Sequence, residues 1–311
     1  MLKKLLLAGA ALVLATGAAS AKELSSVGLS VGSLGNLYFV TMAKGVEAKV
    51  KEINPNAKVN VVDSNYDLNK QFDQIDNFIT SGVDLILLAA ADPQAIAPAI
   101  KRAQAAGVVV VAVDVAAVGA DATVQTNNVQ AGEISCQYIV DKLGADGGQI
   151  IIQNGPQTSS VIDRVNGCRK ALAKNPKIEV LSDDQDGKCS RDGGMNIMQG
   201  HLTRFQEIDA VFTICDPQAT GSDLAAKQLG RSDFFISSVD GAPDVEKALK
   251  GGNTVIEASA SQDPYAMAQM AVQIGYDIMN GKKPDNPMIL MPSTLITKDN
   301  VADYQGWSAP R

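Results

Sequence analysis

Two aspartates, Asp114 and Asp240, end two stretches of this 311-residue chain that follow one pattern. In each stretch an apolar run follows an aspartate, an Asp-Pro-Gln-Ala motif comes next, and a second apolar run ends in a further aspartate. The Asp-Pro aspartate and the final aspartate are 22 residues apart in the first stretch (Asp92 and Asp114) and 24 in the second (Asp216 and Asp240). Each stretch therefore predicts a strand, a turn, a helix and a strand, with a carboxylate at the end of the last strand.

Carboxylates in this position lie where open parallel sheets bind their ligands, in the crevice beyond the carboxyl ends of the strands. Two such units that face each other would direct Asp114 and Asp240 into one cleft. Because ionised carboxylates accept hydrogen bonds from hydroxyl groups, this arrangement suits a small polyhydroxy molecule.

Short apolar runs alternate with helical patterns along the chain. We predict strands at 27–31, 59–62, 85–88, 108–113, 123–126, 149–153, 178–181, 210–214, 234–239, 254–259 and 289–291. Helices are predicted at 39–50, 72–79, 96–105, 131–143, 161–173, 194–204, 219–229 and 265–279. This alternation is typical of parallel sheets covered by helices on both faces, and it restarts after Thr126. The expected fold class is therefore α/β, with two doubly wound parallel-sheet lobes.

The first residues have the pattern of a secretory signal. Lys3 and Lys4 precede an apolar run at 5–13, and Ala19-Ser20-Ala21 is a small-x-small cleavage site. We expect cleavage after Ala21 and a periplasmic, soluble mature chain. An uncleaved anchor helix is the alternative, although the run is shorter than the roughly 20 apolar residues of a membrane span.

The net charge of −7 argues against nucleic acid as a partner, because such binding depends on basic residues that neutralise phosphates. The four cysteines of an exported chain are expected to form disulfides, with three pairings open. Their spacing fits no zinc site, and the only histidine, His201, is expected on a helix surface, so we predict no metal.

The order of these features resembles the periplasmic sugar-binding proteins of the ribose and galactose type. The resemblance covers residues 27–292 and rests on the export signal, the repeated lobes, Asp114, Arg164, Val239-Asp240-Gly241 and Ser261-Gln262-Asp263-Pro264. It implies the type I periplasmic binding protein fold, in which two lobes joined by three hinge strands close on one sugar. It also implies a monomeric substrate-binding component that delivers its ligand to the membrane permease of an ABC importer and needs no cofactor.

The resemblance divides the chain into a signal peptide (1–21), an N-terminal lobe (22–126 plus 263–291) and a C-terminal lobe (127–262 plus 292–311). The expected hinge residues are Thr126, Asn127, Gln262 and Asp263. The final segment, which contains the only tryptophan, Trp307, is expected to fold over the base of a lobe, with Trp307 as its anchor.

Carried over by position, the implied ligand contacts are Asn36, Tyr38, Phe39, Asp114, Arg164, Cys215 or its neighbour Asp216, Asp240 and Gln262. Aromatic rings can cover the C–H face of a sugar, carboxylates accept its hydroxyl hydrogens, and a guanidinium donates in a planar fork. Core packing is the alternative for the rings, a helix cap for the two strand-end acids, and a surface position for Arg164.

Several positions depart from the ribose pattern. Val115 replaces an arginine, Ala90 or Ala91 an asparagine, Cys215 a second asparagine, and Cys189 an aromatic residue. A different monosaccharide, a polyol or a cyclitol therefore fits as well as ribose. Since the family places Cys189 and Cys215 at the cleft, we expect a Cys189–Cys215 disulfide, with Cys136–Cys168 pairing two helices; free buried cysteines are the alternative.

Other functional classes fit less well. The glycine-rich turn after the first strand is not a dinucleotide-binding motif, and no phosphate-binding loop occurs. A glycosidase could use Asp114 and Asp240 as its acid pair, but we expect no enzyme. A receptor for a furanosyl signal in chemotaxis is the second binding hypothesis.

Overall fold

The computed structural model describes residues 22–307. The predicted signal segment and its cleavage site lie outside the described residues. None of the described helices is long and apolar enough to cross a membrane.

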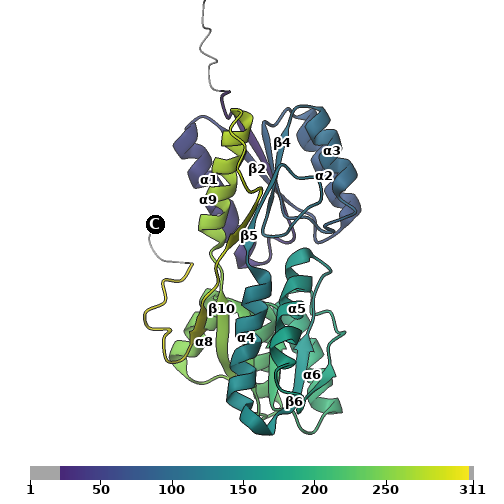
Figure 1. Cartoon of the computed structure of the whole chain (residues 1–311), viewed down its shortest axis with the longest axis vertical. Coiled ribbons are helices and arrows are strands. Elements are labelled where there is room, and N and C mark those ends of the chain that lie inside the picture. Colours follow the sequence, from purple (N-terminus) through teal and green to yellow (C-terminus); the bar gives the residue numbers. More distant parts are fainter. Residues whose placement is uncertain (1–21, 308–311) are drawn as a thin grey trace, which may run out of the picture.

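The first sheet contains five strands from the N-terminal part of the chain and a sixth from near the end of the chain (Figure 1). Its strands are β1 (Ser26–Val31), β2 (Lys58–Asp63), β3 (Leu85–Leu88), β4 (Val109–Val113), β5 (Ala122–Thr126) and β11 (Met288–Met291). They are all parallel, in the order β11-β5-β4-β3-β1-β2. The helices α1 (Leu37–Ile53), α2 (Leu68–Thr80), α3 (Ala97–Ala105) and α9 (Pro264–Met279) cover this sheet. The segment containing α9 and β11 thus returns from the end of the chain to the first lobe.

The second sheet repeats this order. Its strands are β6 (Gly148–Gln153), β7 (Ile178–Ser182), β8 (Ala210–Thr213), β9 (Phe235–Asp240), β10 (Ile256–Ser261) and β12 (Leu295–Thr297). The order is β12-β10-β9-β8-β6-β7, and only β12 is antiparallel to its neighbour. The helices are α4 (Asn128–Leu143), α5 (Ser159–Leu172), α6 (Arg191–Arg204), α7 (Asp216–Gln228) and α8 (Pro243–Gly251), with a short 3₁₀ turn, η1 (Gly144–Asp146).

The chain passes between the two sheets at three connections, from β5 to α4, from β10 to α9 and from β11 to β12 (Figure 1). Thr126 and Asn127 lie at the first connection, and Gln262 and Asp263 lie at the second. Asp263 ends its connection as the N-cap of α9, where its carboxylate accepts a hydrogen bond from the N–H of Ala266 at 3.0 Å. The connections are short, so few backbone torsions can change when one lobe moves against the other.

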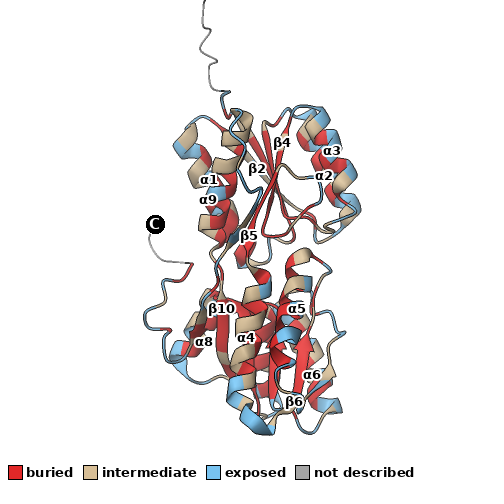
Figure 2. Cartoon of the chain, in the orientation of Figure 1, coloured by how far each residue is buried: buried red, intermediate tan, exposed pale blue. Residues whose placement is uncertain are grey.

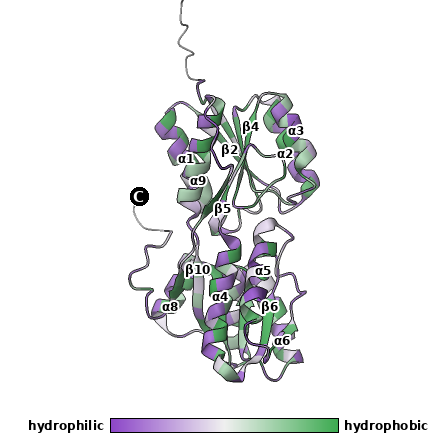
Figure 3. Ribbon diagram, viewed as in Figure 1, coloured by the Kyte–Doolittle hydropathy of each residue, from purple (hydrophilic) through white to green (hydrophobic). Residues whose placement is uncertain are grey.

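The apolar strands explain why each sheet lies inside its lobe. All residues of β3 are buried, as are the inner faces of the flanking helices, while the outer helix faces are exposed (Figure 2). The hydropathy follows the same division, with apolar residues along the strands and polar residues on the outer helix faces (Figure 3). This pattern is expected for parallel sheets covered on both faces, and the predicted α/β fold class is confirmed.

The structure differs from three of the predicted details. The sequence patterns missed α8 and β12, which are a short helix and a three-residue strand within predicted loop and tail. The expectation for His201 was also wrong, because its side chain is 4% exposed and stacks on Phe205 at a centroid distance of 5.9 Å. The buried face of α6 contains Gly194, Met198, His201 and Leu202, so His201 lies on the face that packs against the sheet.

Candidate functional site

A cavity lies between the two lobes. The cavity is lined by seven of the predicted ligand contacts, which are Asn36, Tyr38, Phe39, Asp114, Arg164, Asp240 and Gln262. Tyr66, Thr158, Ser160 and Cys189 are among the other residues that line it. The repeated motifs of the two lobes therefore do meet in one place.

The two strand-end carboxylates are held on unusual backbone. Asp114 follows β4 and Asp240 ends β9, and their residues are 7% and 3% exposed. Their φ angles are 71° and 138°, a region that residues other than glycine seldom adopt. Such backbone persists only where the surrounding structure holds it, which is common at ligand sites. The matching strain at both strand ends indicates that the direction of these two side chains matters.

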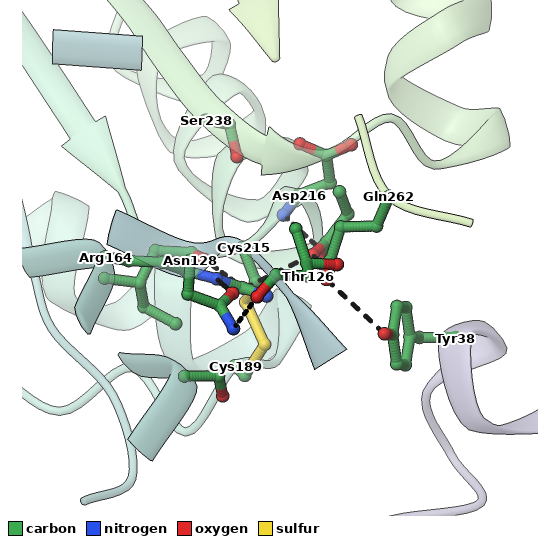
Figure 4. Close-up of polar contacts among 12 residues, drawn as sticks. Tyr38, Thr126, Asn128, Arg164, Cys189, Cys215, Asp216, Ser238 and Gln262 are labelled. Carbon is green, nitrogen blue, oxygen red and sulfur yellow. Dashed lines mark hydrogen bonds and ion pairs between the residues drawn. A yellow bond between two sulfur atoms is a disulfide. The ribbon is translucent and has the colours of Figure 1, made fainter. Parts of the chain in front are cut away.

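Arg164 reaches the cavity from α5 and is 4% exposed (Figure 4). Its Nε donates to Oδ1 of Asn128 at 2.9 Å, and its Nη1 donates to the main-chain oxygen of Ile214 at 2.8 Å. Nη1 also lies 3.4 Å from Oδ1 of Asp240. These contacts use Nε and Nη1 of a guanidinium that carries five N–H donors, so the fork retains donors for a ligand.

Gln262 connects the hinge to the acid of the second lobe. Its Nε2 donates to Oδ1 of Asp240 at 2.7 Å, and its Oε1 accepts from the hydroxyls of Thr126 at 2.7 Å and Tyr38 at 3.4 Å (Figure 4). Gln262 thus contacts the first connection, the first lobe and the second lobe at once. In this structure its side chain satisfies all of these groups at once.

Asp216 and Cys215 lie behind the cavity rather than on its wall. The carboxylate of Asp216 accepts hydrogen bonds from the N–H of Ala242 and the hydroxyl of Ser259, both at 2.7 Å. Its own N–H donates to Oδ2 of Asp240 at 3.1 Å. Cys215 is the N-cap residue of α7. Among the described residues, neither lines the inner cavity, and Asp216 instead helps to orient Asp240.

Three aromatic rings cover the side of the cavity that the first lobe contributes. Tyr38 and Phe39 begin α1, where the side chain of Asn36 caps the helix by accepting from the N–H of Tyr38 at 2.9 Å. The rings of Tyr38 and Phe39 meet edge to face with centroids 5.4 Å apart. Tyr66 is the third ring, from the turn after β2. These rings offer an apolar surface to the C–H face of a ligand.

Burial raises the pKa of the two site acids. For Asp240 the loss of solvent outweighs the nearby Arg164 charge and raises the pKa to about 6. For Asp114 burial also raises the pKa, while Arg164 and the hydroxyl of Tyr38 act in the opposite direction. Asp114 and Asp240 are both buried near a single cation, Arg164. Hydrogen-bond donors of a ligand would therefore stabilise their ionised forms.

The two lobes also touch at the mouth of the cavity, away from the hinge. The N–H of Ala116, in the loop after β4, donates to the hydroxyl of Ser159 at the start of α5, at 2.7 Å. Together with the burial of Asp114 and Asp240, this contact shows that the cleft is closed in this structure.

The structure contains both disulfides that the resemblance implied. Cys136–Cys168 joins α4 to α5, and Cys189–Cys215 joins the loop before α6 to the start of α7. Cys189 lines the cavity, so a disulfide forms part of its wall (Figure 4). Among residues 22–307 no group of histidine, cysteine and acidic side chains could hold a metal ion.

Sequence reasoning missed Tyr66, Asn128 and the two glycines that position Arg164. Tyr66 lies beyond the end of a strand, where ligand contacts are expected in parallel sheets. However, Asn65 and Tyr66 both have positive φ, and no sequence motif predicts this turn. Gly132 on α4 faces the main-chain oxygen of Arg164, and a Cβ there would collide with it. Gly167 on α5 faces α4 in the same way. The close crossing of α4 and α5 therefore places Arg164 and Asn128 together.

Comparison with known proteins agrees with this geometry. A model of the periplasmic binding protein domain matches residues 27–283. The chain is 31% identical to the ribose import binding protein of Bacillus subtilis over 264 residues, 84% of each chain. It is 32% identical to the xylitol-binding protein of Mycolicibacterium smegmatis over 249 residues, 76% of this chain and 68% of that protein.

A similar solved structure is an ABC transporter solute binding protein of Mycobacterium smegmatis with bound glycerol. Its TM-score is 0.84 at 26% sequence identity, and the match covers 93% of this chain and 100% of that one. The matched family model spans both lobes and the cavity between them. The chain belongs to the periplasmic binding protein family.

Proposed function

We propose that this protein captures a monosaccharide, polyol or cyclitol in the cavity between its lobes. The proposal rests on one observation. Asp114 of the first lobe and Arg164 and Asp240 of the second lobe line one closed cleft, together with aromatic rings. Two carboxylates and a guanidinium fork can hydrogen-bond several hydroxyls, while the rings cover the C–H face. Ribose, xylitol and glycerol, which the names of the similar proteins give, are all small polyhydroxy molecules.

Family membership makes the chain a binding protein rather than an enzyme. We propose that the lobes consist of 22–126 plus 263–291 and 127–262 plus 292–311, and that they close about the hinge formed by Thr126, Asn127, Gln262 and Asp263. The closed protein then acts as a monomer in the periplasm and docks on the permease of an ABC importer. Export through a signal peptide cleaved after Ala21 is part of this proposal.

A thermal-shift screen of the chain starting at Lys22 tests the ligand class. The panel contains D-ribose, D-allose, L-arabinose, xylitol, myo-inositol and glycerol, with maltose and an amino acid as controls. A ligand at 100 times its Kd is expected to stabilise the protein by about 2.7 kcal/mol, because it binds only the folded state. The proposal is wrong if none of the six polyhydroxy compounds raises Tm and a control compound does.

Ligand affinity is expected to rise with pH through about 6. The pKa of Asp240 is about 6 in the closed arrangement without ligand, and hydroxyl donors favour its ionised form, so binding in mildly acidic buffer releases a proton. Calorimetry between about pH 5 and pH 8, in buffers that differ in ionisation enthalpy, measures both the affinity and the proton release. An affinity that does not change over this range would contradict the assignment.

The same raised pKa has the opposite effect on the ligand-free protein. Its folded form holds a proton on Asp240 between the pKa of an unfolded aspartate, 3.8, and about 6. The free energy of unfolding should therefore decrease as the pH rises through this interval. Denaturant titration of the ligand-free protein at several pH values checks the sign.

Replacing both Cys189 and Cys215 by alanine is expected to weaken ligand binding several-fold, whereas replacing both Cys136 and Cys168 is not. The bonded cysteines are 26 and 32 residues apart, so the chain-entropy model gives both disulfides a similar stabilisation of about 3–4 kcal/mol. Only Cys189 lines the cavity. Denaturant titration measures the stability of each variant and calorimetry measures the affinity; equal affinities in both variants would show that the disulfide wall makes no contact of consequence.

A further inference from the structure

The segment after β12 is attached to the second lobe. The hydroxyl of Tyr304 donates to the main-chain oxygen of Gly241 at 2.9 Å, directly after the site residue Asp240. Gly306 lies against the carboxylate of Glu246 on α8. The segment is therefore fixed to this lobe up to the residue before Trp307.

Trp307 then contacts the first lobe. It is the only tryptophan of the chain, is 8% exposed, and belongs to the hydrophobic cluster of the first sheet. Its indole Nε1 donates to the main-chain oxygen of Gln262 at 2.9 Å. Its ring meets the ring of Tyr38 edge to face, with centroids 5.5 Å apart at 70°. The last described turn thus forms a further link between the lobes, beside the three chain connections and the contact between Ala116 and Ser159.

Both partners of Trp307 line the ligand cavity, but Trp307 does not. It lines a groove outside the cavity, so its effect on a ligand must pass through Tyr38 and Gln262. The side chain of Gln262 donates to Asp240 at 2.7 Å and accepts from the hydroxyl of Tyr38 at 3.4 Å. The indole therefore contacts the main chain of Gln262 and the ring of Tyr38, and the side chains of Gln262 and Tyr38 contact each other.

We propose that Trp307 is a positioning residue of the ligand site, which supports Tyr38 and Gln262 from behind and favours the closed arrangement of the lobes. The proposal rests on the proposed function for its effect on affinity. A segment anchored on the second lobe can keep Trp307 against Tyr38 of the first lobe only while the lobes remain together. Opening would break the ring contact or detach the segment, so Trp307 slows ligand release.

The variants Trp307→Ala and Trp307→Phe test this role. Trp307→Ala is expected to weaken binding of D-ribose, xylitol or myo-inositol, whichever the unaltered protein binds, by roughly tenfold, chiefly through faster dissociation, as expected for one aromatic contact and one hydrogen bond. Trp307→Phe retains the ring and loses only the N–H donor, so it should recover part of the affinity. Phe78→Leu, a buried change in α2 of the first lobe, is the control for lost stability and should leave the affinity within about twofold.

A double-mutant cycle separates positioning from a general loss of stability. If Trp307 acts through Tyr38, then the double variant Trp307→Ala/Tyr38→Ala should have a much smaller fold-loss of affinity than the product of the fold-losses of the two single variants. Losses that multiply, or an unchanged dissociation rate in Trp307→Ala, would overturn the proposal.

A ligand-free measurement keeps this proposal distinct from the proposed function. Small-angle X-ray scattering of the ligand-free protein should give a larger radius of gyration for Trp307→Ala than for the unaltered protein or Phe78→Leu. An unchanged radius would overturn the role of Trp307 in closure. If none of the three probes binds the unaltered protein, then the proposed function fails for them and scattering alone decides the role of Trp307.

Discussion

Replacing Arg164 by alanine is expected to lower the free energy of unfolding by about 3–5 kcal/mol and to abolish binding of polyhydroxy ligands. The guanidinium is the only cation that contacts the buried carboxylate of Asp240 among the described residues, and removal of one partner of a buried pair leaves an uncompensated charge. The change also leaves Oδ1 of Asn128 and the oxygen of Ile214 without the donors that they have now.

The size of this effect is measured against a neighbour on the same helix. Arg169, five residues further along α5, forms an ion pair with Asp183 in which both side chains are largely exposed. Arg169→Ala should therefore change stability by less than about 1 kcal/mol and leave the affinity unaltered. The losses of stability and affinity in Arg164→Lys should lie between those of Arg164→Ala and Arg169→Ala, because lysine keeps the charge but lacks the planar fork. Denaturant titration and calorimetry on all three variants decide; equal losses in Arg164→Ala and Arg169→Ala would remove Arg164 from the site.

The α/β fold could be predicted because its signals are local. Apolar strands, helical spacing and glycine stops recur in order, and the repeat of the Asp-Pro units indicated a second sheet like the first. The missed elements lack such signals. The helix α8 has nine residues and the strand β12 has three, and β12 exists only because β10 provides an edge with which it pairs.

The candidate site was predictable where a residue follows a strand, as Asp114 and Asp240 do. It was not predictable where position depends on packing between distant elements. Gly132 allows α5 to lie close to α4, and no local sequence pattern around Gly132 predicts its contact with Arg164. The indole of Trp307 contacts Gln262 across 45 residues of sequence. Asp216 illustrates the converse, since the resemblance placed Cys215 or its neighbour Asp216 near the ligand while the carboxylate of Asp216 accepts from Ala242 and Ser259.

The two site acids differ in how the protein uses them. Asp240 accepts hydrogen bonds from the side chain of Gln262 and the N–H of Asp216, and lies near Arg164. Burial is the largest cause of the raised pKa of both acids, but the carboxylate of Asp114 has fewer donors, since only the Tyr38 hydroxyl bonds to it and only the Arg164 charge also opposes the effect of burial. A ligand hydroxyl would therefore improve the surroundings of Asp114 more than those of Asp240, which the protein already satisfies.

Replacing Asp114 by asparagine is accordingly expected to weaken ligand binding by about 10²–10³-fold with little loss of stability. The change removes a charged acceptor of one or two hydroxyls, each bond being worth about 1.5–3 kcal/mol, while asparagine tolerates the φ of 71° that this position requires. Removing a buried carboxylate also relieves its desolvation, so the ligand-free protein should be as stable as before or slightly more stable.

The control for Asp114→Asn is Asp73→Asn, which makes the same change at an exposed position of α2 in the same lobe. It should alter neither affinity nor stability by more than about 0.5 kcal/mol. Asp240→Asn provides the contrast, because it disturbs the bonds to Gln262 and Asp216 and should reduce both stability and affinity. If Asp114→Asn instead unfolds the protein as readily as Asp240→Asn and leaves the affinity of the folded fraction unchanged, then Asp114 supports the strand end and does not contact the ligand.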